Sequence, residues 1–200
     1  MREYTIARTY DAPDFSAVEA LPIDTLLWCP EVPITAQAQI CYDETALYVR
    51  LSAQEPNIRA EERGPLGVPC VDSCLEFFFC PIEGDDRYLS IECNPNGCLF
   101  LGFGPNVEEL VRLIPENPSI RPVTKRIPGG WETVYAIPYS FIRMFFPGFS
   151  PASGSTMRAN FYKCGDDCET PHYVAFSPVS TLPPGFHNPE CFAIFRKEIK

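Results

Sequence analysis

The sequence has little basic charge. Sixteen Lys and Arg residues stand against 26 Asp and Glu residues, and the formal net charge is −10. Because proteins hold phosphate backbones and anionic lipid headgroups with basic surfaces, we expect neither a nucleic acid nor a membrane surface as a partner. No apolar run approaches the roughly 20 residues that a membrane-spanning helix requires, which agrees with this expectation.

The motifs of several enzyme classes are also missing. The chain has only two histidines, His172 and His187. Neither accompanies a Gly-x-Ser-x-Gly sequence or a cysteine-protease signature, which argues against a serine or cysteine hydrolase. No glycine-rich loop is long enough to cradle a nucleotide phosphate, so a nucleotide-binding enzyme is not expected either.

The first residues, Met1-Arg2-Glu3-Tyr4-Thr5, are not followed by the apolar stretch of a signal peptide. We therefore expect a cytoplasmic protein. Since thiols stay reduced in that compartment, most of the ten cysteines are predicted to be free. Neither a Ser/Gly-rich linker nor a repeat divides residues 1–200, which predicts a single domain.

Proline, by contrast, is abundant. The 22 prolines separate short runs in which apolar and polar residues alternate with a period of two. This pattern predicts an all-β fold, an antiparallel β-sandwich with at most one or two short helices. The segment 139–146 is apolar enough for a short helical turn. The predicted strands are residues 35–42, 46–54, 71–80, 87–94, 98–101, 131–137, 156–164 and 191–195.

The polar faces of these strands suggest a binding surface. Carboxylates, amides, a guanidinium group and phenol groups can bond to the hydroxyl groups of a sugar, and aromatic rings can lie against its apolar C–H face. The chain is rich in such rings, with 15 Phe, nine Tyr and two Trp. The candidate residues on these faces are Glu76, Tyr88, Glu92, Asn94, Arg158 and Asn160.

Other interpretations of the same residues stay open. The polar side chains also fit an ordinary solvated sheet face. Glu76 and Glu92 lie on strands expected to be neighbours, so they also fit the acid and base of a glycosidase. A structural zinc ion at Cys164, Cys168 and His172 is a further candidate, because the two cysteines flank a turn; unliganded thiols are the preferred interpretation there.

Five segments together carry a resemblance to a known family. They are Tyr-Asp-Glu-Thr-Ala-Leu-Tyr-Val at 42–49, Val-Asp-Ser-Cys-Leu-Glu-Phe-Phe at 71–78, Trp-Glu through Ile-Pro at 131–138, Arg-Ala-Asn-Phe-Tyr-Lys-Cys at 158–164, and residues 184–192. Their order and spacing resemble the carbohydrate-binding module family 9-like proteins, which share the DOMON-type β-sandwich. The likeness covers about residues 20–198.

The resemblance implies a non-catalytic module that binds glycans, often at chain ends, as do family members attached to xylanases. The last two segments are similar to the ending of stand-alone bacterial members. Glu76 corresponds to the family's strand glutamate, and Glu92 and Asn94 to a polar pair on the next strand. Family members clamp a sugar between two tryptophans. One falls near Cys70, where this chain has no aromatic residue, and the other near Phe186.

We therefore interpret the chain as binding a mono- or oligosaccharide, such as a xylan- or glucan-derived end, on a polar sheet face bounded by Phe186. The resemblance also implies a structural calcium ion, for which the acidic turn at Asp85-Asp86 is a candidate. The alternative is a structural or protein-interaction sandwich that has lost sugar binding. A pairing of Glu76 with Arg158 would favour that alternative, because it would close the face.

Overall fold

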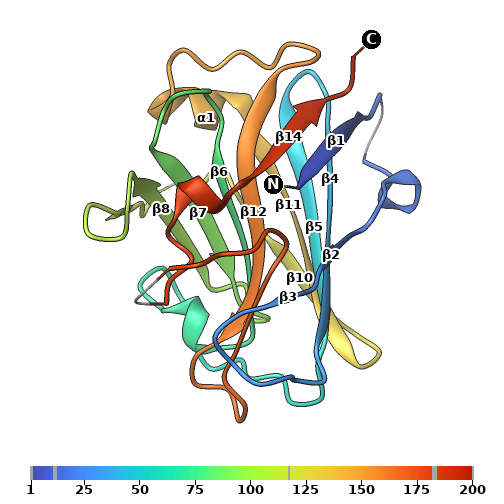
Figure 1. Cartoon of the computed structure of the whole chain (residues 1–200), viewed down its shortest axis with the longest axis vertical. Helices are drawn as coiled ribbons and strands as arrows, with labels where there is room; N and C mark the ends of the chain where they lie inside the picture. Colours follow the sequence, from blue (N-terminus) through green and yellow to red (C-terminus); the bar gives the residue numbers. More distant parts are fainter. Residues whose placement is uncertain (1, 11–12, 117, 182–183, 200) are drawn as a thin grey trace.

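The computed structural model describes residues 2–10, 13–116, 118–181 and 184–199 (Figure 1). The helix α1 (Tyr139–Phe145) lies where the sequence predicted a helical turn, and three short 3-10 turns, η1 (Phe15–Ala17), η2 (Pro69–Val71) and η3 (Pro189–Cys191), lie in loops. The strands are β1 (Glu3–Arg8), β2 (Leu21–Ile23), β3 (Thr25–Leu26), β4 (Thr35–Tyr42), β5 (Ala46–Gln54), β6 (Cys74–Cys80), β7 (Tyr88–Cys93), β8 (Leu99–Gly104), β9 (Val111–Arg112), β10 (Val123–Ile127), β11 (Gly130–Pro138), β12 (Thr156–Gly165), β13 (His172–Ala175) and β14 (Ala193–Lys197).

The strands form two facing layers that share one strand (Figure 1). The first layer has the order β10-β11-β5-β4, and the second has the order β14-β12-β6-β7-β8-β9. β1 lies between β4 and β14 and is parallel to both, whereas the other pairs are antiparallel. The all-β prediction is confirmed, and the sheet is mixed rather than purely antiparallel. No hairpin turn links β1 to either neighbour, so nothing in its connections imposes an antiparallel direction.

The sequence located the long strands better than the short ones. The predicted hairpin matches β4 and β5 residue for residue, and β6, β7, β11 and β12 lie within or close to their predicted ranges. Six strands were not predicted: β1, β2, β3, β9, β10 and β13. Most of these are short, and an alternating pattern over two to five residues cannot be distinguished from a loop.

Between the layers lies an aromatic core. Phe77 of β6 stacks on Phe79 at 5.0 Å between ring centroids and on Phe161 of β12 at 4.6 Å. All three rings are fully buried. Burying a ring of this size stabilises the fold by about 1.5–3 kcal/mol, so this stack contributes much of the cohesion between the layers.

A buried ion pair also connects the two layers. Lys163 of β12 is fully buried, and its Nζ lies 3.2 Å from Oε2 of Glu55, which follows β5. The ammonium group also donates to the Cys164 carbonyl at 2.9 Å and lies 2.6 Å from Nε2 of His172. The indole N–H of Trp131 donates to the second oxygen of Glu55 at 2.8 Å. These bonds replace the water that both charges lose on burial.

The outer side of the second layer is buried as well. Two loops, at residues 27–29 and 184–192, cover the face that carries Glu76, Tyr88 and Glu92, and these three side chains are at most 6% exposed. The side chains point outward as the alternation predicted, but they are covered rather than solvated. The cluster that packs there comprises Leu27, Cys74, Phe78, Cys80, Tyr88, Tyr162, Cys164, Ala175, Val179, Phe186 and Phe192.

We expect the Glu55–Lys163 pair to be essential as a pair. Glu55→Gln or Lys163→Met alone leaves one buried charge without its counter-ion, and each should lower the free energy of unfolding by about 3–5 kcal/mol. The double variant removes both charges and should lose less than the sum of the two. Urea unfolding of the four proteins measures this. Single losses below about 1 kcal/mol would contradict the interpretation, since that is the range of solvated pairs.

Candidate functional site

Under the two covering loops lies a cavity of about 290 Å³. Its floor carries Glu76 of β6, Glu92 of β7 and Cys164 of β12, and Cys70 of η2 and Asp166 lie beside them. Small-molecule pockets typically measure about 300–1,000 Å³, so this cavity fits a small ligand. The three floor residues come from neighbouring strands, which fixes their relative positions by backbone hydrogen bonds.

An aromatic wall formed by Trp28, Tyr173 and Phe186 bounds the cavity. The Phe186 ring centroid lies 5.8 Å from that of Trp28 and 6.2 Å from that of Tyr173. Behind it, Phe186 stacks on the buried Tyr162 at 4.2 Å, with only 10° between the ring planes. The Tyr162 hydroxyl donates to the Phe186 carbonyl at 3.2 Å. Ring and backbone of Phe186 are therefore both held in place.

Trp28 has an unusual backbone conformation. Its φ is +47°, the only positive φ of a non-glycine residue in the described part of the chain. A bulky side chain in this region costs on the order of 1–3 kcal/mol, and such strain occurs most often at functional sites. Trp28 follows β3, and its strained backbone places the indole on the cavity wall. β3 pairs with β13, which contains Tyr173.

The two floor carboxylates form a close pair. Glu76 and Glu92 are directly opposite each other on β6 and β7, and both are almost fully buried. Burial raises the pKa of Glu76 to about 7. Burial, followed by the charge of Glu76, raises the pKa of Glu92 well above its ordinary value. At neutral pH the pair therefore retains at least part of its protons. Among the described residues, Oε1 of Glu92 has no hydrogen-bond partner.

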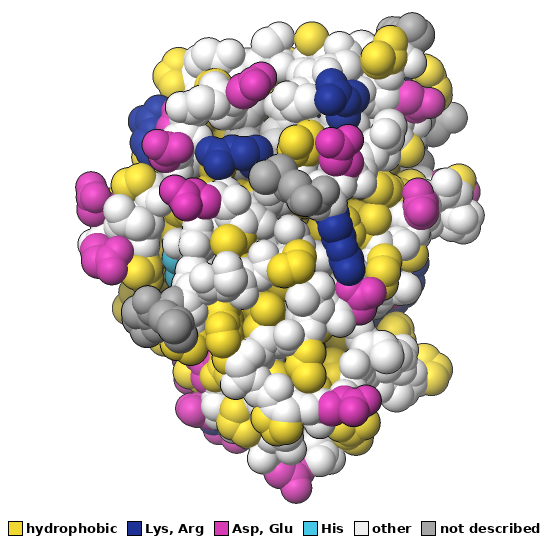
Figure 2. Space-filling view, viewed as in Figure 1, with side chains coloured by type: hydrophobic (Ala, Val, Ile, Leu, Met, Phe, Trp, Pro, Cys, Tyr) yellow, Lys and Arg dark blue, Asp and Glu magenta, His cyan; other side chains and the backbone are white. Residues whose placement is uncertain are grey.

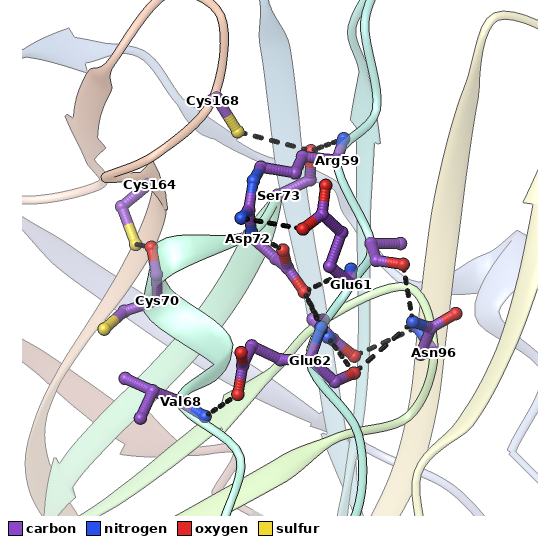
Figure 3. Close-up of polar contacts among 12 residues, drawn as sticks. Arg59, Glu61, Glu62, Val68, Cys70, Asp72, Ser73, Asn96, Cys164 and Cys168 are labelled. Carbon is purple, nitrogen blue, oxygen red and sulfur yellow. Dashed lines mark hydrogen bonds and ion pairs between the residues drawn. The ribbon is translucent and has the colours of Figure 1, made fainter.

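A polar network centred on Asp72 fixes the turn that carries Cys70 (Figure 3). The carboxylate of Asp72 pairs with Arg59 and accepts the backbone N–H groups of Glu61 at 2.9 Å and Glu62 at 2.8 Å. Asn94 donates to the same carboxylate at 2.7 Å. Because Asp72 is fully buried, these donors replace solvent and hold the segment before β6 against the sheet.

Only three of the predicted site residues line this cavity: Glu76, Glu92 and Phe186. Tyr88 is fully buried, and its hydroxyl lies 2.8 Å from Nδ1 of His187, a cavity residue. Tyr88 therefore supports the site from behind. Burial lowers the pKa of His187 to about 4, so its ring is neutral at physiological pH.

The structure does not bring Asn94, Arg158 and Asn160 to the cavity. Asn94 is occupied in the Asp72 network described above. Asn160 exchanges hydrogen bonds with the backbone of Ser177, accepting its N–H at 2.8 Å and donating to its carbonyl at 2.9 Å. All three amide and guanidinium groups are used to hold backbone segments, a role that strand alternation alone does not reveal.

Arg158 lies near the opposite end of β12 from Cys164. It donates to the carbonyls of Pro189 at 3.1 Å and Asp85 at 2.9 Å. It does not pair with Glu76, so the contact expected for a closed, non-binding face is not formed between these two residues.

The acidic side chains of the Asp85-Asp86 turn lie beside guanidinium groups. The carboxylate of Asp85 binds the Arg87 guanidinium through both oxygens, at 2.9 Å and 2.6 Å. Asp86 lies 3.8 Å from Arg158. Calcium, which takes six to eight oxygen ligands, stays a prediction for this chain.

The three residues considered for zinc do not converge. The Cys164 thiol donates to Oε1 of Glu76 at 2.9 Å on the outer face of β12. His172 instead contacts Lys163, and the Cys168 thiol lies 3.8 Å from the Ser73 hydroxyl. Cys164 therefore points away from the other two.

Two further hollows among the described residues lack the combination of rings and buried acids. One of about 310 Å³ is lined largely by aliphatic residues and prolines, and one of about 430 Å³ lies beside Arg158 and Arg196. On the face shown in Figure 2, basic side chains lie close to acidic ones and form no continuous patch. No helix among the described residues is long and apolar enough to cross a membrane.

Comparison with known proteins identifies the family. The profile of Carbohydrate-binding family 9 matches residues 10–196. The chain belongs to carbohydrate-binding family 9. The resemblance seen in the sequence is thereby confirmed. No curated protein matches the sequence of this family 9 protein.

Solved structures agree with this assignment. A candidate carbohydrate-binding protein from Bacteroides uniformis is 28% identical with a TM-score of 0.80, and the match covers 98% of this chain and 99% of that one. A family 9 module from Caldicellulosiruptor kristjanssonii in complex with cellotriose is 15% identical, with a TM-score of 0.72 over 100% and 95% of the two chains. The glucose complex of a family 9 module from that organism is 14% identical, with a TM-score of 0.70 over 100% and 97%. The latter two show the shared fold.

Sequence reasoning missed most of the cavity wall of this family 9 protein. Trp28, Tyr173 and His187 line the cavity, and none was predicted as a site residue. Trp28 is one of only two tryptophans, and it lies in a segment, Leu-Leu-Trp-Cys-Pro, without strand alternation. A large ring in a proline-bounded loop was the one available signal.

The Glu76 pKa predicts a specific pH dependence of stability. Between the unfolded pKa near 4.5 and the folded pKa of about 7, the folded protein keeps a proton that the unfolded chain has released. This contribution therefore lowers the free energy of unfolding as the pH rises. Glu76→Gln removes this proton and also one cause of the raised pKa of Glu92, so the stability of the variant relative to the wild type should increase from pH 5 to pH 8.

Urea unfolding at the two pH values tests this expectation. Glu83→Gln at an exposed position is the control, and its difference from the wild type should stay constant. A pH-independent difference for Glu76→Gln as well would show that the floor carboxylate does not titrate in this range.

Proposed function

We propose that this family 9 protein binds the end of a saccharide chain in the cavity, without cleaving it. One observation carries the proposal: an aromatic wall and an acidic floor meet in a single small cavity. Aromatic rings offer an apolar surface to the C–H face of a sugar, and carboxylates accept hydrogen bonds from its hydroxyl groups. Family membership and the related modules with glucose and cellotriose support a ligand of this class.

The spacing of the rings favours contact with one face of the sugar. Carbon atoms in contact lie about 3.5–4 Å apart, so a sugar clamped between two rings needs roughly 7–8 Å between them. The Trp28 and Phe186 centroids are only 5.8 Å apart and the rings are tilted by 31°. We infer that a sugar packs against this wall rather than between its rings.

The size and chemistry of the cavity favour a terminal sugar unit. A volume of about 290 Å³ admits little more than one ring, and the rest of a chain would extend past the covering loops. The floor offers acceptors in Glu76 and Glu92, while Asp166 and His187 add polar groups at the wall. Glucose and the ends of cello- or xylo-oligosaccharides are therefore the ligands we propose.

The decisive test is calorimetric titration of the purified protein with glucose, cellotriose and xylotriose. Trp28→Gly suits the left-handed backbone and removes the indole, and it should weaken binding about fivefold or more, because one stacking ring contributes on the order of 1 kcal/mol. Glu92→Gln should also weaken binding, because it replaces one carboxyl oxygen on the cavity floor, an acceptor for sugar hydroxyl groups, with an NH₂ group. Tyr10→Ala removes an exposed ring far from the cavity and should leave affinity unchanged.

Two outcomes would overturn the proposal. Absence of binding to all three sugars would favour the structural or protein-interaction alternative. Release of cleaved sugar that disappears in both Glu76→Gln and Glu92→Gln would identify a glycosidase instead.

A further inference from the structure

We propose that Cys74, Glu76 and Cys164 form a zinc site in the floor of the cavity. In the described part of the chain, these three side chains are the group of His, Cys, Asp and Glu residues whose ligand atoms converge, all within 4.8 Å of one another. Two thiolates and one carboxylate match the ligands of Zn²⁺, whereas calcium and magnesium require oxygen ligands. This inference goes beyond the proposed function, since it concerns an ion and not a saccharide.

Strand pairing fixes the three ligands. Cys164 of β12 is directly opposite Cys74 of β6, and Glu76 is two residues further along β6 on the same face. Directly opposed residues in an antiparallel pair have Cβ atoms about 4.5–5.5 Å apart, and diagonal neighbours remain within reach. The Cys164 thiol already lies 2.9 Å from Oε1 of Glu76. The ligands therefore require only small side-chain movements to surround an ion.

The carboxyl groups of the floor would be stabilised by a cation. Glu92 is only 6% exposed and lines the cavity beside Glu76. Its Oε1 has no hydrogen-bond partner in the described part of the chain. Two opposed buried carboxyl groups cannot both ionise without a counter-charge beside them. A divalent cation bound to Glu76 supplies that counter-charge.

A buried positive charge lies next to the proposed ligands, which would carry negative charge. The Lys163 ammonium group bonds to the Cys164 carbonyl at 2.9 Å from the inner side of β12. Glu76 and Cys164 also line the cavity, as Cys70 does, so an ion held by the first two would border the cavity. Binding proceeds with loss of the two thiol protons to solvent, so zinc affinity should rise with pH.

The test uses the reduced protein, residues 1–200, and Zn²⁺ alone, without any sugar. Calorimetry should show one tight site, and Co²⁺ in its place should give a thiolate-to-metal charge-transfer band. Cys74→Ser and Cys164→Ser should each lower Zn²⁺ affinity at least tenfold and reduce the band of the Co²⁺ form to about half, because one of the two thiolates remains. Cys80→Ser is the matched control, because Cys80 lies on the same face of β6 and is equally buried, yet lies outside the cluster.

Glu76→Gln keeps the shape of the side chain and guards against variants that fail to fold. It should retain the fold by circular dichroism and still weaken Zn²⁺ binding tenfold. The proposal is overturned if the wild type takes up no Zn²⁺, if Cys80→Ser weakens binding as much as Cys164→Ser, or if mass spectrometry finds a Cys74–Cys164 disulfide in the protein before reduction. Trp28→Gly should leave Zn²⁺ binding intact, so failure of the saccharide proposal and failure of this one are distinguishable.

Discussion

The constraint on which the rest of this structure depends is that β6 is buried on both faces. Its alternation sends Phe77 and Phe79 between the layers and Cys74, Glu76 and Phe78 to the other side. A strand whose covered face carries an acid needs loops that pack on that face and hydrogen-bonding groups on the neighbouring strands, because buried polar groups require partners. The covering loops, the Asp72 network and the close pair of carboxylates all follow from this requirement.

Site and core are therefore parts of one arrangement. Phe186 belongs to the outer hydrophobic cluster through its stack on Tyr162, and it also bounds the cavity. Lys163 extends from the inner face of β12, and Cys164 lies on the outer face of that strand. The groups that hold the covering loops therefore also position the rings and acids of the cavity. A substitution in the outer hydrophobic cluster should then also change the cavity.

Local patterns in the sequence predicted much of the fold but less of the site. Alternation over eight or nine residues located β4 and β5 exactly, and it assigned Glu76 and Glu92 to one face. It could not show that Asn160 is satisfied by Ser177, because that contact depends on tertiary structure. Trp28 and Tyr173 are 145 positions apart along the chain, so no local pattern connects them. Cys74 and Cys164 converge because of the register between β6 and β12, which the spacing of residues within one segment does not encode.

The place of β1 has a consequence for how the chain reaches this structure. Glu3 pairs with Ile194, so the strand that joins the two layers cannot find one of its neighbours until the 190 residues between them have been synthesised. Contacts this distant in sequence slow folding, and until closure β4 and β14 present open hydrogen-bonding edges. Assembly should therefore end with the closing of a seam between the two ends of the chain, and aggregation should compete most strongly at that late stage.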